Sequence, residues 1–224
     1  MPGETAAKMR PVRILAGGAL IDGDLTVPAR AAGLVVFAHG SGSSRFSRRN
    51  RAVAQTLEDG GFATLLLDLL TRDEEAVDLV TRKYRFDVDR LGHRVVAAID
   101  WARGEPGIAD LPIACFGAST GAAAALIAGA ARPDRVGAII SRGGRPDLAG
   151  DALSLVRAPT LLIVGGADDV VIELNRTAMG RLRSHVELQI VAGASHLFEE
   201  PGTLEQVSRL ALDWCRRYLP RSRP

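Results

Sequence analysis

The chain has 224 residues, a net charge of +2 and an apolar fraction of 47%, which is enough to build the core of one domain. The near-neutral charge argues against a broad basic surface for nucleic acid. No apolar run approaches the roughly 18 residues that span a bilayer, and residues 1–11 lack the apolar segment of a signal peptide. We therefore expect a single cytoplasmic domain over residues 1–224, with frayed ends at 1–11 and 220–224 and no nucleic-acid or membrane partner.

Hydrophobic patterning predicts an antiparallel hairpin followed by alternating strands and helices. The hairpin is predicted over residues 12–16 and 19–27, on either side of Gly17-Gly18. The later strands are predicted at 33–38, 62–67, 113–116, 136–140, 160–164 and 186–191, and helices at 49–60, 88–103, 122–131, 147–155, 172–182 and 203–218. Continuous apolar strands, each followed by a helix, indicate a mostly parallel twisted sheet with helices on both faces.

The two cysteines fit a reducing compartment. Cys115 lies inside an apolar strand segment and Cys215 inside the last helical pattern, so we expect two unpaired buried thiols. A disulfide between them, and a nucleophilic role for Cys115, are the less favoured alternatives.

The pattern Gly-x-Ser-x-Gly at residues 117–121 lies between a predicted strand and an alanine-rich helix. A serine at such a turn is held in a strained backbone conformation with its hydroxyl exposed above the sheet. Ser119 is therefore the candidate nucleophile. The alternative is a glycine-rich turn with an idle serine, since so short a pattern arises by composition about one time in ten.

Function in an open parallel sheet lies at the carboxyl ends of the strands. There the sequence places Ser119, then Asp168 and Asp169, and then His196 after the last strand. The order Ser, Asp, His is the one expected for an α/β-hydrolase. The sequence therefore predicts a catalytic triad, with the choice between the two aspartates left open.

The predicted chemistry is acyl transfer to water through an acyl-serine. His196 would take the proton of Ser119 because a serine hydroxyl is a poor nucleophile at neutral pH, and a carboxylate would orient the imidazole. The backbone N–H groups of Ser41 and Thr120 would stabilise the tetrahedral oxyanion. Loss of one such donor typically costs about 2.7 to 4 kcal/mol of transition-state stabilisation.

Five motifs together resemble a small serine hydrolase of the dienelactone hydrolase-like group. They are residues 39–44 (HGSGSS), 117–121 (GASTG), 141–146 (SRGGRP), 165–168 (GGAD) and 194–196 (ASH). The resemblance implies an α/β-hydrolase fold, and its Gly-Gly-x-Asp pattern favours Asp168 as the acid. True dienelactone hydrolases carry cysteine where this chain has Ser119, so their substrate is not carried over. The likeness is closer to serine-bearing bacterial members, some of which are similar to domains fused to phosphoribosyltransferases.

Arginines follow two of the strands that deliver candidate residues. Arg45, Arg48 and Arg49 follow the predicted oxyanion loop, and Arg142 and Arg145 follow strand 136–140. Gathered at the site they would bind a carboxylate or phosphate; the alternative is ordinary solvated or paired surface charge. The candidates for substrate binding are His39, which is expected to shape the oxyanion loop, and Gly40, Arg45, Arg142 and Arg145.

The chain leaves little room for a lid. Residues 140–160 hold one loop and one short helix, so no large cap is expected and an open site favours a small ester, lactone or thioester. No zinc spacing, Walker loop or Rossmann glycine pattern occurs, so we expect no cofactor and no metal. Amidase or acyltransferase chemistry with the same residues, and a non-catalytic binding module, remain alternatives. The protein is expected as a monomer or homodimer.

Overall fold

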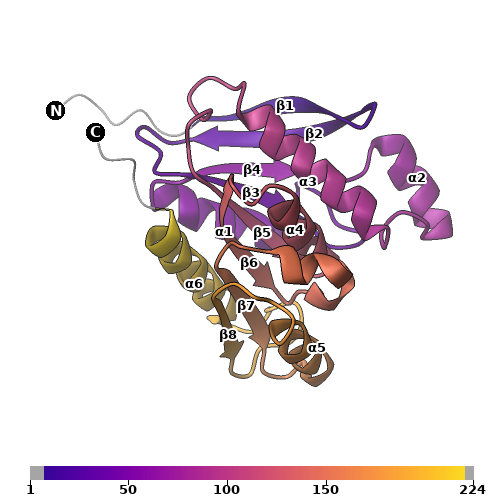
Figure 1. Ribbon diagram of the computed structural model, residues 1–224, viewed down its shortest axis with the longest axis vertical. Coiled ribbons are helices and arrows are strands. Elements are labelled where there is room, and N and C mark those ends of the chain that lie inside the picture. The colour runs from indigo at the N-terminus through magenta and orange to yellow at the C-terminus, as the bar shows by residue number, and fades with distance from the viewer. Residues whose placement is uncertain (1–7, 220–224) are drawn as a thin grey trace.

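The apolar strands pair into one eight-stranded sheet in the computed structural model, which describes residues 8–219. The strands are β1 (Lys8–Ala16), β2 (Ala19–Val27), β3 (Leu34–Ala38), β4 (Ala63–Leu67), β5 (Ile113–Ala118), β6 (Val136–Arg142), β7 (Thr160–Gly165) and β8 (Val186–Val191). The helices are α1 (Arg48–Asp59), α2 (Arg72–Thr81), α3 (Val88–Ala102), α4 (Thr120–Ala131), α5 (Asp169–Met179), α6 (Thr203–Tyr218) and the 3₁₀ segment η1 (Pro146–Leu155). Figure 1 labels the strands and the helices α1 to α6 along the chain.

The order of the strands locates the functional edge of the sheet. The order is β1-β2-β4-β3-β5-β6-β7-β8, with β1, β2 and β4 paired antiparallel and all strands from β4 to β8 parallel. From the central β3 the chain passes first to β4 on one side and later to β5 on the other. Such a reversal opens a crevice at the carboxyl ends of the two strands, and the segments 39–44 and 119–121 both begin there.

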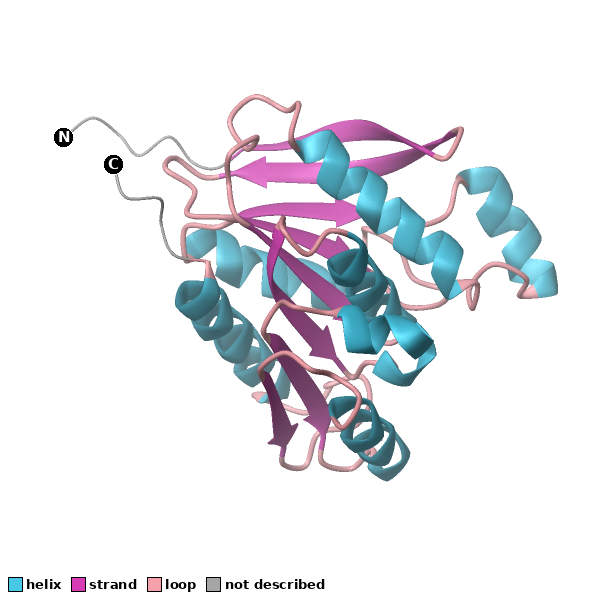
Figure 2. Cartoon of the chain, viewed as in Figure 1, coloured by secondary structure: helices cyan, strands magenta, loops and turns pink. Residues whose placement is uncertain are grey.

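Both faces of the sheet are covered, as expected for continuous apolar strands (Figure 2). Successive side chains of β3 alternate between two cores: Leu34 and Val36 pack toward α3 and α4, and Val35 and Phe37 pack toward α1 and α6. The two cysteines lie in different cores and are free and buried. Burial raises the pKa of each thiol to about 12.

The first strand begins earlier than the sequence suggested. Residues 8–11, which we expected to fray, pair with β2, and Pro11 lies opposite Asp24. Proline is tolerated there because β1 is the edge strand of the sheet. The rest of the expected frayed ends, 1–7 and 220–224, lies outside the described residues. Within the part of the chain that the structure describes, no helix is long and apolar enough to cross a membrane.

Helix α2 was absent from the prediction. The side chain of Thr71 caps the backbone N–H of Glu74, and the side chain of Glu74 caps that of Thr71, a reciprocal capping box. Its Thr-x-x-Glu signature was present in the sequence. The helix buries no apolar stripe against the core. Its one buried residue is Asp78, and Leu79 and Val80 are 70% and 86% exposed.

Several boundaries differ near the functional edge. The predicted helix 147–155 is the 3₁₀ segment η1, interrupted at Gly150 by a φ of 55°. Strand β6 runs on to Arg142, and α4 and α5 begin at Thr120 and Asp169, earlier than expected. The segment between β6 and β7 contains η1 alone, which agrees with the absence of a large cap.

Candidate active site

Ser119 forms a sharp turn between β5 and α4. Its φ of 52° and ψ of −124° lie in a region that L-residues rarely occupy. The two flanking glycines are required by close packing: a methyl group on Gly121 would overlap the carbonyl oxygen of Ala38, and one on Gly117 would overlap the backbone of Ala122. The strand and the helix therefore approach each other closely enough to present Ser119 at the edge of the sheet.

His196 is held by Asp168. Its Nδ1 lies 2.6 Å from Oδ2 of Asp168, with side chains 39% and 16% exposed respectively. Asp169, the alternative, is the first residue of α5 and is exposed. A methyl group on Gly165 would overlap the carbonyl oxygens of the 194–195 loop. That glycine therefore lets the histidine loop pack against the end of β7.

One cavity of about 250 Å³ receives both Ser119 and His196. Gly40 and Ser41 form one of its walls, and the start of α1 forms another. Among the described residues, Ser119 and the imidazole are not hydrogen-bonded to each other. In the resting structure the two groups thus share a cavity while the imidazole is bonded to its carboxylate.

The predicted oxyanion residues lie side by side. Oγ of Ser41 lies 3.0 Å from Oγ1 of Thr120, which follows Ser119 directly. Gly40 packs so closely on the serine that an added Cβ would come within 2.9 Å of the Ser119 Cβ. The loop after β3 and the start of α4 thus meet beside the candidate nucleophile.

His39 does not present a polar group to a substrate. It is buried, its Nδ1 lies 2.9 Å from the carbonyl oxygen of Gly40, and its Nε2 accepts a hydrogen bond of 3.0 Å from the backbone N–H of Leu69. This pattern assigns the neutral Nδ1–H tautomer. Burial lowers the pKa of His39. Its hydrogen bonds join the oxyanion loop to the loop after β4, and its role in substrate binding stays a prediction.

Two of the predicted arginines are also structural. Arg45 forms ion pairs with Asp68 and Asp24, and Arg145 binds Asp147 through two hydrogen bonds of 2.8 and 2.7 Å. Neither side chain lines the cavity of Ser119. Each guanidinium is already bonded to carboxylates in this structure, and a role of either arginine in substrate binding stays a prediction.

Arg142 differs from both of them. It is buried, lines the cavity, and makes one side-chain hydrogen bond, 3.3 Å from Nη2 to Oδ1 of Asn50. Its Nε has no partner, and within residues 8–219 no carboxylate lies in salt-bridge range. Burial, and secondly the charge of Arg49, lower the pKa of Arg142 to about 10. The cavity therefore contains a buried cation that has no counterion among the described residues.

The N-terminus of α1 adds positive potential to the same cavity. Ser47 caps the helix by accepting from the backbone N–H of Asn50, and the first turn carries no acidic residue. Arg49 lies in that turn and pairs at 3.2 Å with the exposed Glu199, and its buried Nε has no partner in the described part of the chain. The helix dipole favours anions there. Sequence reasoning missed Ser47 and Asn50, although a serine before a helical pattern was a visible capping signal.

The fold and the position of these residues define an α/β-hydrolase. The sheet has the antiparallel start and the mostly parallel order of that class, and the candidate residues follow β5, β7 and β8. The profile of the Dienelactone hydrolase family matches residues 21–216. The chain belongs to this family.

Known proteins agree with that assignment. A dienelactone hydrolase from Anabaena variabilis ATCC 29413 superimposes with a TM-score of 0.93 at 51% identity, covering 95% of this chain and 99% of that one. The esterase Est1E from Butyrivibrio proteoclasticus superimposes with a TM-score of 0.78, covering 93% of this chain and 98% of that one; at 18% identity it shows the fold alone. Family and fold together indicate a hydrolase.

A longer protein is also similar. A Mycobacterium tuberculosis protein named as a phosphoribosyl transferase is 55% identical over 203 residues, which is 91% of this chain and 45% of that protein. The chain thus spans about half the length of the curated relatives it matches.

The residues described here include no group of three or more His, Cys, Asp or Glu side chains able to hold a metal ion.

Proposed function

We propose that this protein is a serine hydrolase that cleaves a small ester, lactone or thioester. The observation that carries the proposal is the hydrogen bond of 2.6 Å between Asp168 and His196 beside the cavity that Ser119 enters. A carboxylate bonded to Nδ1 leaves Nε2 as the nitrogen that can accept a proton. The imidazole then acts as the base for the serine.

The reaction proceeds in two halves. His196 takes the proton of Ser119 as the hydroxyl attacks the carbonyl carbon, and the N–H groups of Ser41 and Thr120 stabilise the oxyanion. The imidazolium protonates the leaving alcohol or thiol, and a water activated by the same imidazole releases the acid. The imidazole must move into reach of the serine hydroxyl, as catalytic hydrogen bonds often tighten only in the substrate complex.

A fluorophosphonate probe tests the nucleophile directly. We expect wild-type protein to be labelled and to hydrolyse 4-nitrophenyl acetate and butyrate, and the folded Ser119→Ala variant to do neither. Folded wild-type protein that is neither labelled nor active would support a non-catalytic binding module instead. A comparison of esters, lactones, thioesters and amides on wild-type protein then separates hydrolysis of each class, and added alcohol or amine acceptors reveal acyltransferase activity.

The substrate that we propose carries an anionic group. Arg142 is a buried cation without a carboxylate partner in the described chain, and the positive end of α1 faces the same cavity. A buried charge of this kind is costly unless a ligand neutralises it. A carboxylate or phosphate on the substrate would accept hydrogen bonds from Arg142 and raise its lowered pKa again.

Matched esters test this preference. We expect wild-type protein to favour the 4-nitrophenyl monoester of succinic acid over that of butyric acid. Replacement Arg142→Leu should lower kcat/KM for the anionic ester by about 10- to 100-fold, as expected for a hydrogen-bonded charge worth roughly 1.5 to 3 kcal/mol, and change the neutral ester little. Arg145→Leu is the control, because its guanidinium is paired with Asp147 outside the cavity. Equal losses for both esters would overturn the anionic substrate while leaving the serine mechanism intact.

A further inference from the structure

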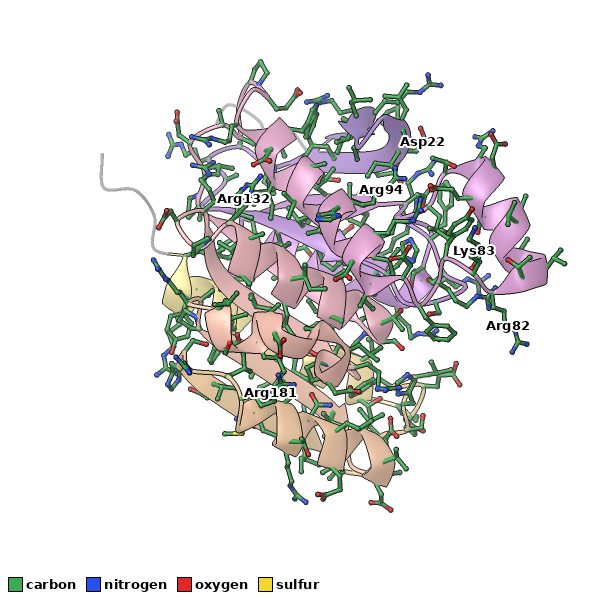
Figure 3. The ribbon with its side chains drawn as sticks, turned by 45° about the vertical axis from the view of Figure 1, so that its right-hand side comes forward. Asp22, Arg82, Lys83, Arg94, Arg132 and Arg181 are labelled. Atoms are coloured by element: carbon green, nitrogen blue, oxygen red, sulfur yellow. The ribbon has the colours of Figure 1, made fainter. Side chains whose placement is uncertain are left out.

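A second cavity lies on the opposite side of the oxyanion loop. Residues 40, 41 and 43 line both cavities, so this loop is the wall between them. The far side is formed by α2, the segment 82–87 and the start of α3. In Figure 3, Arg82 and Lys83 mark the segment that follows α2.

A buried carboxylate organises this far side. Asp78 of α2 is 3% exposed. Its Oδ1 accepts hydrogen bonds from the backbone N–H groups of Tyr84 and Arg85, at 2.7 and 2.9 Å, and its Oδ2 accepts one of 2.7 Å from Nε of Arg85. Burial by itself would raise the pKa of Asp78, but the hydrogen bonds from Arg85 and Tyr84 and the charge of Arg85 bring it below its ordinary value. The carboxylate thus holds the backbone of the 84–85 segment in one position.

The held segment is bonded to the oxyanion loop. The hydroxyl of Ser41 donates a hydrogen bond of 3.0 Å to the backbone carbonyl of Arg85. The same hydroxyl lies 3.0 Å from Oγ1 of Thr120, which can donate to it. A continuous chain of hydrogen bonds therefore runs from Asp78 through Arg85 and Ser41 to Thr120. Its last two members, Ser41 and Thr120, are the residues whose N–H groups are assigned to the oxyanion.

We infer that Asp78 and the hydroxyl of Ser41 are positioning residues for the oxyanion hole. The inference rests on the proposed serine hydrolase function. Gly40 packs against Ser119, but Ser41 and Gly42 are exposed and Gly42 has a φ of 68°, so packing does little to hold this part of the loop. A loop anchored on one side only would place its N–H less accurately. Errors of about 1 Å at a reacting centre can cost on the order of 10²-fold in rate.

The role predicts a particular kinetic signature. Because the oxyanion develops in the transition state and the tetrahedral intermediate and is absent from the bound ester, loss of its positioning lowers kcat and leaves KM nearly unchanged. The variant Ser41→Ala removes the hydroxyl and keeps the backbone N–H. Ser41→Thr restores a hydroxyl, and Asp78→Asn removes the charge that holds Arg85.

The test measures kcat and KM for 4-nitrophenyl butyrate, together with the affinity for a trifluoromethyl ketone that mimics the tetrahedral state. We expect Ser41→Ala and Asp78→Asn each to lower kcat about tenfold with KM within about twofold, a parallel loss of ketone affinity, and recovery in Ser41→Thr. The double variant should be no slower than the slower single variant, because both changes break the same chain. Asp100→Asn is the control: it removes the charge of an Asp–Arg pair away from the loop, with Arg132 at the end of α4 (Figure 3), and should keep wild-type kcat.

Two kinetic results would contradict the inference. A Ser41→Ala enzyme with kcat within about twofold of wild type, or fold-losses that multiply in the double variant, would overturn it. If Asp78→Asn does not fold, the comparison of Ser41→Ala with Ser41→Thr decides alone. Wild-type protein without esterase activity or fluorophosphonate labelling would refute the proposed function itself, which separates the two failures.

Discussion

The two sides of the oxyanion loop treat arginine in opposite ways. On the side of α2 and α3, three arginines are paired: Arg85 with Asp78, Arg90 with Asp87 and Glu74, and Arg94 with Glu74. On the side of the catalytic cavity, Arg142 has no carboxylate partner in the described chain, and Arg49 has an exposed one that water can replace.

This difference separates structural charge from charge available to a ligand. A guanidinium bonded to a carboxylate has its charge neutralised, so it fixes the backbone around it, although among the described residues Nη1 of Arg94 is buried without a partner. An unpaired buried guanidinium keeps an unmet demand for an anion. The paired side therefore suits a support for the loop, and the unpaired side suits a binding surface.

The largest expected effect comes from replacing the acid of the proposed triad, on the side of the catalytic cavity. Asp168→Asn should lower kcat for ester hydrolysis by about 10⁴-fold, because the amide favours the wrong imidazole tautomer. Asp169→Asn, one residue further and exposed at the start of α5, should leave kcat within about twofold of wild type. Steady-state kinetics on a neutral ester measure both. A larger loss in Asp169→Asn than in Asp168→Asn would identify Asp169, and not Asp168, as the acid of the triad.

A smaller effect concerns His39, which begins the oxyanion loop directly after β3. Burial lowers the pKa of His39 from 6.5, so the unfolded chain binds its proton at a higher pH than the folded protein does. Wild-type stability should therefore fall as the pH drops below about 6.5, by up to about 1.4 kcal/mol per pH unit relative to His39→Gln. Urea unfolding of both proteins between pH 5 and 8 measures the difference. A difference that does not change with pH would contradict the buried neutral imidazole.

The smallest expected effect comes from removing a negative charge beside the catalytic cavity. Glu199 is 64% exposed and pairs with Arg49 at 3.2 Å, so its charge competes weakly with an anionic substrate. Glu199→Gln should raise kcat/KM for the succinate monoester about twofold and leave the butyrate ester unchanged. Higher salt should reduce this gain, since exposed charges are screened. A gain for both esters would indicate a change in access to the cavity instead.

Helix α2 shows how a strong local signal can be overlooked. Its capping box is local and was readable in the sequence, but its buried side is a single carboxylate, Asp78. A search for apolar periodicity cannot find such a helix. The contribution of α2 to the oxyanion loop depends on the contact between Arg85 and Ser41, which are 44 residues apart.

The sequence by itself determined the fold class, the family and the turn at Ser119. The fold class and the turn follow from continuous apolar strands and from glycines that are needed where backbones approach within contact distance, and the family follows from the resemblance of five short motifs; all of these are properties of short segments. Only the tertiary structure decided that Asp168 contacts His196, that Arg45 and Arg145 are paired and that Arg142 has no carboxylate partner within residues 8–219. The reason is that an ion pair depends on which carboxylate the fold brings near a guanidinium, and a flexible side chain carries no local record of that partner.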